Sequence, residues 1–336
     1  MINLNRNVII KSVGTYVPQK KVHKNKLIQY FEQYGSQNEA RELLDGIGRE
    51  TISIMAENET VITMGLASSK ICLQKAGLTP NDIDVIISAS NTPEFLSPTG
   101  AMLIRDGLNS NAHQVLDVNC DCIGMLQGLN VATSLLKSNK QYKRALVVGA
   151  FGCLRNSRKD NIISYATVGD NSTAMILEVQ EEEIERGFLG HRSLTDSQYI
   201  EAIQFPACGM SKIFDKNINE FEKRLRWDNF NSHFIPKSSA DVITELLTDC
   251  NYKPEDVTQF FLSQFSIEYN ELTMDAMNLP HNRFTFIADK YGYTGPCSPL
   301  LALHDRIQEK PFNENELCIM CSVAAGCIIT ALLYKW

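Results

Sequence analysis

The chain has 336 residues, of which 44% are hydrophobic and 21% charged, and it carries a net charge of −7 at pH 7. This composition is typical of a globular protein, and the acidic balance disfavours nucleic acid or an anionic membrane surface as the main partner. No run approaches about 18 uncharged apolar residues, and the first residues lack the cleavage pattern of a signal peptide. We therefore expect a cytoplasmic protein without a membrane span.

Short apolar runs alternate with longer amphipathic stretches along the chain. Residues 59–78 and 124–139 have helical spacing of their apolar positions, and Gly77 is a plausible residue just past the end of the first helix. The alternation predicts an α/β protein with largely buried sheets. The runs expected to be strands are 85–88, 115–118, 145–150, 174–179, 259–265, 317–323 and 328–334.

Two stretches of the sequence repeat one pattern. Residues 76–90 and 250–265 each contain the end of a helix, a turn of the form P-[NE]-D at Pro80 or Pro254, and a hydrophobic strand. This echo favours two similar halves, which we place at 1–180 and 181–336. The irregular stretch at about 185–237 is interpreted as an insertion that forms part of a pocket.

The chain has ten cysteines, most of them in apolar surroundings, which is typical of buried and reduced thiols. Cys120 and Cys122 are separated by one residue, in "VLDVNCDCIGMLQGL". Two ligands alone do not make a zinc site, and no second Cys or His pair has a suitable spacing. A disulfide between these two cysteines would close a very small, strained ring. We therefore predict no metal ion.

A nucleophile is the remaining interpretation of this thiol pair. The strand at 115–118 ends just before it, and a helix begins near Gly124. A thiol at a helix N-terminus lies at the positive end of the helix dipole, which lowers its pKa. Gly124 would allow the backbone or a substrate to approach closely.

The same segment resembles the nucleophile motif of β-ketoacyl-acyl-carrier-protein (ACP) synthase III and its thiolase-superfamily relatives, Asp-x-x-x-x-Cys-x-Gly. Spacing from Asp117 places the family nucleophile at Cys122 and leaves Cys120 without a role. Further blocks that are similar to the family lie in the same order along the chain. They are "VGTYVPQKKVHKNKL", the block from Gly46 to Leu108, "ALVVGA" with "ATVGDNSTAMIL", and "FIADKYGYTGPCSPLLALHDRI".

The resemblance implies a thiolase-like fold, in which two similar α/β halves form a five-layered α-β-α-β-α core, usually in a homodimer. It also implies a catalytic set of Cys, His and Asn. The family histidine, in the motif "PHQAN", falls on Gln264, and the family asparagine falls on Tyr293. The glycine-rich oxyanion loop falls on "SVAAGC", where a backbone N–H of Ala325 or Gly326 can still donate.

Other family features are altered as well. The residue that lines the acyl tunnel before Pro98 is Ser97, residues 38–45 lack the tryptophan that stacks on coenzyme A (CoA), and an ACP-docking arginine falls near Tyr269. Asp121 either acts as a base or raises the thiol pKa. His233 either replaces the missing histidine or is an ordinary loop histidine.

These residues predict an acyltransferase or condensing enzyme of specialised, polyketide or fatty-acid-derived metabolism. Cys122 would take an acyl group from acyl-CoA or from the phosphopantetheine of an acyl-carrier protein and pass it to a second substrate, with no further cofactor. Two alternatives stay open. One is a non-catalytic or partner subunit of a heteromeric ketosynthase-like complex, and the other is a decarboxylative 3-oxoacyl-ACP synthase III.

Overall fold

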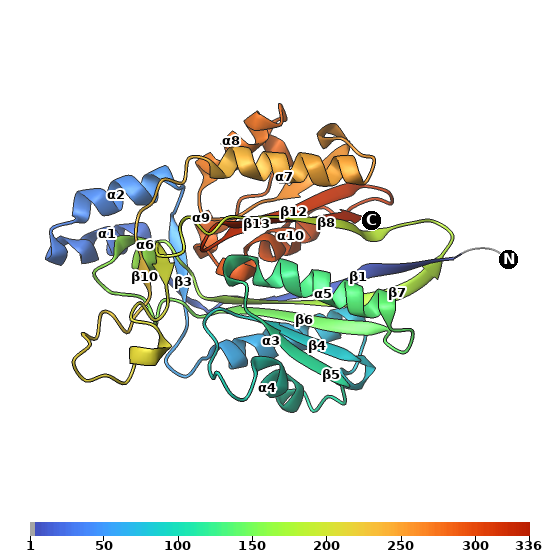
Figure 1. Ribbon diagram of the computed structural model, residues 1–336, viewed down its shortest axis with the longest axis horizontal. Coiled ribbons are helices and arrows are strands. Elements are labelled where there is room, and N and C mark those ends of the chain that lie inside the picture. Colours follow the sequence, from blue (N-terminus) through green and yellow to red (C-terminus); the bar gives the residue numbers. More distant parts are fainter. Residues whose placement is uncertain (1–3) are drawn as a thin grey trace.

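The structure is a computed structural model, and it describes residues 4–336 (Figure 1). None of the helices in this range combines the length and the apolar character that crossing a membrane requires. The longer strands are β1 Asn5–Tyr16, β4 Val85–Ala89, β5 Gln114–Val118, β6 Arg144–Phe151, β7 Asn171–Glu182, β8 Gly187–Thr195, β11 Val257–Phe261, β12 Leu317–Ala324 and β13 Ile328–Lys335. The short strands are β2 Lys20–His23, β3 Thr51–Ile54, β9 Ile203–Gln204 and β10 Arg226–Trp227.

Helices connect these strands. The longer helices are α2 Gln37–Gly46, α3 Val61–Ala76, α4 Gly100–Gly107, α5 Gly124–Ser138, α7 Ile235–Asp249, α8 Ile267–Ala276 and α10 Ser298–Glu309. The short helices are α1 Lys24–Tyr30, α6 Ile162–Ala166 and α9 Ala288–Tyr291. Helix α3 shows why its segment is helical: Thr60 and Thr63 form a capping box at its start, and Gly77 ends it with a φ of 67°.

The long strands form one nine-stranded sheet in the order β11-β12-β13-β8-β1-β7-β6-β4-β5. In the first half β1 pairs antiparallel with β7, β7 pairs antiparallel with β6, and β6 pairs parallel with β4. In the second half β8, β13, β12 and β11 repeat the same succession. The halves meet at a single pair, Val8 of β1 and Gly187 of β8.

Five layers result from this arrangement (Figure 1). Helices α3 and α4 cover the outer face of the first half-sheet, and α7 and α8 lie on the outer side of the second. Helices α5 and α10 lie between the two half-sheets and contact strands of both. A core of apolar side chains from α5, α10 and the strands fills this middle layer. The predicted α-β-α-β-α core is confirmed.

The two copies of the sequence echo lie in equivalent places. Pro80–Asp82 and Pro254–Asp256 are both short 3₁₀ turns, and they lead into β4 and β11, the corresponding strands of the two halves. We therefore propose that the chain consists of two related halves, 1–180 and 181–336, although β7 continues to Glu182.

Two expectations about local structure are wrong. The insertion does not begin near 185, because residues 187–195 form β8, which pairs with β13 in the middle of the sheet. The irregular part begins after Thr195. The strand expected at 259–265 ends at Phe261, and residues 262–266 leave the sheet as a loop. This loop turns out to form one wall of the site.

Candidate active site

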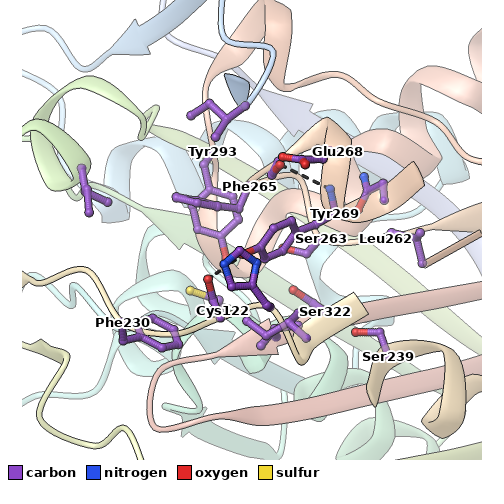
Figure 2. Close-up of a pocket in the computed structure, with 18 of the residues that line it drawn as sticks. Cys122, Phe230, Ser239, Leu262, Ser263, Phe265, Glu268, Tyr269, Tyr293 and Ser322 are labelled. Carbon is purple, nitrogen blue, oxygen red and sulfur yellow. Dashed lines mark hydrogen bonds between the residues drawn. The ribbon is translucent and has the colours of Figure 1, made fainter. Parts of the chain in front are cut away.

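A cavity of about 370 Å³ opens between the two halves, and Cys122 lies in its wall. The rest of the wall comes from α2, from residues 227–235, from the loop after β11 with α8, and from the end of β12. Segments that are far apart in the sequence therefore meet around one thiol, as Figure 2 shows.

Cys122 follows directly from a sharp turn of the chain. Asp121 has a φ of 47°, in the left-handed region, and the 3₁₀ turn Asp121–Ile123 then leads into α5. Aspartate tolerates this conformation better than most residues do. The turn holds the thiol two residues before Gly124, the first residue of α5.

The thiol is buried and protonated at rest. Burial raises the pKa of Cys122 to about 12, and the hydrogen bond from the Tyr293 hydroxyl only partly opposes this rise. The sequence-based expectation of a lowered pKa at the helix N-terminus is therefore wrong in its net direction. Removal from water is the largest cause, because the thiolate loses its hydration.

Tyr293 is buried in the cavity wall near Cys122 and Ser263 (Figure 2). Burial, followed by the nearby Cys122, raises the pKa of Tyr293 well above its ordinary value, so the phenol stays protonated. Its backbone is fixed as well, since its N–H donates to Thr167 O and its carbonyl accepts from Gly169 N. The cavity thus contains a row of three hydrogen-bonding side chains: Cys122, Tyr293 and Ser263.

Gln264 does not face the thiol, which corrects its sequence-based placement. Its side chain is fully buried, and its amide nitrogen donates to Leu262 O at 3.0 Å and to Thr285 O at 2.9 Å. Its amide oxygen accepts from Ile287 N at 2.8 Å. All of its polar atoms bind backbone groups, and Ser263 lines the cavity instead.

Arg49 also fixes the loop after β11, through hydrogen bonds to its backbone. It is completely buried and donates to Phe265 O at 3.0 Å and to Ala288 O at 2.6 Å. Burial lowers its pKa to about 9, while the charge of Asp289 opposes that change. Arg49 and Gln264 together fix the loop that presents Ser263 and Phe265 to the cavity.

Several other predicted residues lie outside the cavity wall. Asp121 is not part of the lining, and burial raises its pKa; its charge adds to the rise in the pKa of Cys122. Of the two roles considered for Asp121, the structure therefore favours raising the thiol pKa. Gly124 does not line the cavity, because its α-carbon faces Ala89, the Val118 carbonyl and Pro296.

Of the two residues expected in the oxyanion loop, one lines the cavity and the other does not. Ala325 lines the cavity at the turn between β12 and β13. Gly326 does not, and its φ of 72° shapes the turn while its α-carbon faces Ile200. Ser97 is exposed in the loop before α4 and lies outside this cavity.

His233 does reach the cavity: it is an exposed residue of the wall, in the segment that precedes α7. Reasoning from the sequence did not find most of the other residues that line the cavity. Trp227 stacks on Phe265 with ring centroids 5.4 Å apart, and Phe265 meets Tyr293 edge-on at 5.6 Å. Ser232 and Tyr269 share a hydrogen bond of 2.6 Å. In the sequence, only the aromatic residues of "RWDNFNSHF" and "SQFSIEY" indicated that these segments line a pocket.

Comparison with known proteins identifies the family. Residues 116–196 match the model of 3-oxoacyl-[acyl-carrier-protein] synthase III, and residues 247–336 match the model of its C-terminal part. The β-ketoacyl-[acyl-carrier-protein] synthase III of Bartonella bacilliformis is 24% identical and covers 98% of this chain and 99% of its own length. That of Clostridium perfringens strain SM101 is 26% identical over the same shares.

This chain is a β-ketoacyl-ACP synthase III-like protein. Solved structures agree with its thiolase-like fold. The 3-oxoacyl-[acyl-carrier-protein] synthase III of Aquifex aeolicus VF5 has a TM-score of 0.84 at 22% identity and covers 98% of this chain and 100% of its own. The priming β-ketosynthase of the R1128 polyketide pathway has a TM-score of 0.87 at 18% identity and covers 100% of this chain and 98% of its own.

In this synthase III-like protein, Ser263 rather than Gln264 lines the cavity. When Gln264 is set against the glutamine of the motif "PHQAN", the histidine position falls on Ser263. The cavity therefore holds Cys122 with a serine and a tyrosine where the resemblance implies a histidine and an asparagine.

Proposed function

We propose that this protein is an acyltransferase of specialised metabolism that carries an acyl group on Cys122. The single observation that carries the proposal is the position of this thiol, which lies in the wall of a cavity of about 370 Å³ that Tyr293 also lines. Neither Ser263 nor Tyr293 is an imidazole or a carboxamide, so the usual partners of a decarboxylation are replaced. The thiol remains able to exchange acyl groups.

The first step is a thioester exchange. The Cys122 sulfur attacks the carbonyl carbon of an acyl-CoA or acyl-carrier thioester and forms a new C–S bond, while the old C–S bond breaks. The proton of Cys122 passes to the departing sulfur, so the donor leaves as a thiol and no charge accumulates. Tyr293 orients the thiol through its hydroxyl. We assign the oxyanion of the tetrahedral intermediate to the backbone N–H groups of Cys122 and Ala325.

The second step transfers the acyl group to an acceptor that enters the same cavity. The acceptor nucleophile forms a bond to the acyl carbon, the bond to Cys122 breaks, and the acceptor proton returns to the thiol. Decarboxylation of a malonyl group would need donors at a developing enolate, and each missing donor of this kind costs on the order of 3 kcal/mol. Transfer to an existing nucleophile does not have this requirement.

Intact-protein mass spectrometry tests the proposal. The protein is incubated with acetyl-, butyryl- and octanoyl-CoA and with the corresponding acyl-carrier thioesters. We expect the mass of one acyl group on the wild type and none on Cys122→Ala. Cys120→Ala is the matched control, because Cys120 lies two residues away and outside the cavity wall, and it should be acylated like the wild type. Absence of acylation with every donor would contradict the proposal and favour a non-catalytic partner subunit.

Decarboxylative condensation is a second candidate, favoured by the position of His233 in the cavity wall, which offers an imidazole at another place. Release of carbon dioxide from malonyl thioester by the wild type, lost in His233→Ala, would support it.

Light scattering of the purified protein measures whether it forms the homodimer that the resemblance implies.

A further inference from the structure

The opening of the cavity is acidic. The ionisable lining residues are Glu42 on α2, Asp228, Glu268 on α8, His233, and the buried groups around the thiol. The three carboxylate residues and His233 are exposed, so they mark the side that faces solvent. No lysine or arginine belongs to the wall, within the part of the chain that the structure describes.

Two of these carboxylates have no compensating charge. Asp228 pairs with Arg226 at 3.1 Å. Within residues 4–336, no cation lies within 4 Å of the carboxylate of Glu42 or Glu268. Carboxylates around an opening with low-dielectric walls attract cations and repel anions. We assign this attraction to the acyl acceptor, which enters after the donor has left.

Behind this opening the wall is aromatic. Trp227, Phe265 and Tyr293 pack against one another, and Trp227 and Tyr293 lie 6.2 Å apart. Phe230 and Tyr269 complete the aromatic part of the lining (Figure 2). The faces and edges of aromatic rings suit an alkyl chain, and their faces also attract an ammonium group once it leaves water.

Polar side chains without partners lie in the same wall. Ser322 is completely buried, Asn270 is 3% exposed, and both line the cavity. The Ser322 hydroxyl and the Asn270 amide nitrogen have no hydrogen-bond partner among the described residues. Buried polar groups in native proteins are almost always paired, so these two atoms are unusual, but both are enclosed by protein and neither is exposed to the cavity.

We infer that the acyl acceptor is an amine that enters as a cation, so that the product is an amide. This inference rests on the proposed function, since it names the second substrate of the same site. The carboxylates of Glu42 and Glu268 attract the ammonium group, and the aromatic wall accepts its carbon skeleton.

The transfer step balances for such an acceptor. One proton of the ammonium passes to solvent through the exposed imidazole of His233 and leaves a neutral amine. The nitrogen lone pair forms a bond to the acyl carbon, and the bond between that carbon and the Cys122 sulfur breaks. The second proton passes from nitrogen to sulfur, which regenerates the thiol.

Three probes of similar shape test the charge preference: phenethylamine, 2-phenylethanol and 3-phenylpropanoate. Their affinities for the full-length wild type are measured by isothermal titration calorimetry in 50 mM and 500 mM salt. We expect the amine to bind about tenfold more tightly than either other probe at low salt, and this preference to shrink at high salt. Equal affinities for amine and alcohol would overturn the inference.

The double variant Glu42→Gln/Glu268→Gln should reduce the preference for the amine to about twofold, since it removes both charges and keeps both side-chain shapes. Glu39→Gln is the matched control, because Glu39 is exposed on the same helix as Glu42 but lies outside the cavity wall. A preference that persists in the double variant would overturn the assignment to these residues. Thermal unfolding of each variant checks that it is folded.

Acylation of Cys122 and amide formation are followed separately by mass spectrometry. A protein that is acylated but prefers no amine overturns this inference and leaves the proposed function in place. A protein that prefers the amine but is never acylated overturns the proposed function, while the cation preference stands.

Discussion

The loops that follow the equivalent strands β4 and β11 have opposite characters. After β4, residues 90–99 include an exposed segment around Phe95 and Leu96, and the following helix α4 is capped from elsewhere, by Asp117. After β11, residues 262–266 are mostly buried, form a wall of the cavity that Cys122 also lines, and contribute Ser263 and Phe265 to it. The repeated strand order therefore provides a scaffold, and the loop sequences decide where the chemistry takes place.

Gln264 gives the largest expected effect on stability in this comparison. Gln264→Ala leaves the Ile287 N–H and the carbonyls of Leu262 and Thr285 without their buried partner. We expect the free energy of unfolding to fall by about 3 kcal/mol. Urea denaturation measures it.

Gln259→Ala is the control for this prediction. Gln259 has one side-chain hydrogen bond, to Thr285 Oγ1 at 3.1 Å. Gln259→Ala should lower the free energy of unfolding by about 1 kcal/mol. Equal losses for both variants would show that the loop after β11 does not depend on Gln264.

The next largest effect is expected from Tyr293→Phe, which should lower the reactivity of the Cys122 thiol. The Tyr293 hydroxyl lowers the pKa of Cys122 against the rise that burial causes, so Tyr293→Phe raises this pKa further above about 12. The thiolate fraction at any pH below the pKa then falls. Since one pKa unit is a tenfold change, we expect alkylation of Cys122 by iodoacetamide to slow by roughly threefold to tenfold at pH 9.

The alkylation rate rises with pH in both proteins, and mass spectrometry of peptides locates the label. Tyr291→Phe serves as the control, because the Tyr291 hydroxyl binds Asp305 at 3.1 Å and lies outside the cavity wall. A Tyr293→Phe variant that reacts faster than the wild type would reverse the assigned role of the phenol.

The smallest effect is expected from replacing Asp117, which caps helix α4 in the first half of the chain. Its carboxylate accepts from Gly100 N at 2.7 Å and from Ala101 N at 2.8 Å, at the N-terminus of α4. Asp117→Ala should lower the free energy of unfolding by about 1 kcal/mol, the usual value of a helix cap. Asp106→Ala, an exposed change near the end of α4, should be close to neutral. A loss as large as that of Gln264→Ala would remove the contrast between the two loops.

Much of the fold could be predicted because buried strands have unbroken apolar sequences. This holds for β4, β6, β7, β12 and β13, and the helical spacing predicted α3 and α5. Strand β8, "GFLGHRSLT", was missed because its second half, residues 191–195, is largely polar and mostly exposed, so it resembles a loop. Its partner β13 could be recognised because it is apolar on both faces.

The candidate site was harder to predict. Cys122 and Tyr293 were named through the resemblance to the family motifs, and both line the cavity. Gln264 and Ser263 are neighbours, so an error of one residue exchanged a side chain that binds backbone groups for the one that lines the cavity. Trp227 and Glu42 come from segments with no motif, and only the folded chain brings them to the cavity.

The protonated state of Cys122 has a consequence for the survival of the protein under oxidative stress. Peroxides oxidise thiolates, and a thiol whose pKa is raised to about 12 contains almost no thiolate at neutral pH. The same burial that makes the thiol a slow nucleophile at rest therefore protects it from conversion to sulfenic and sulfinic acids.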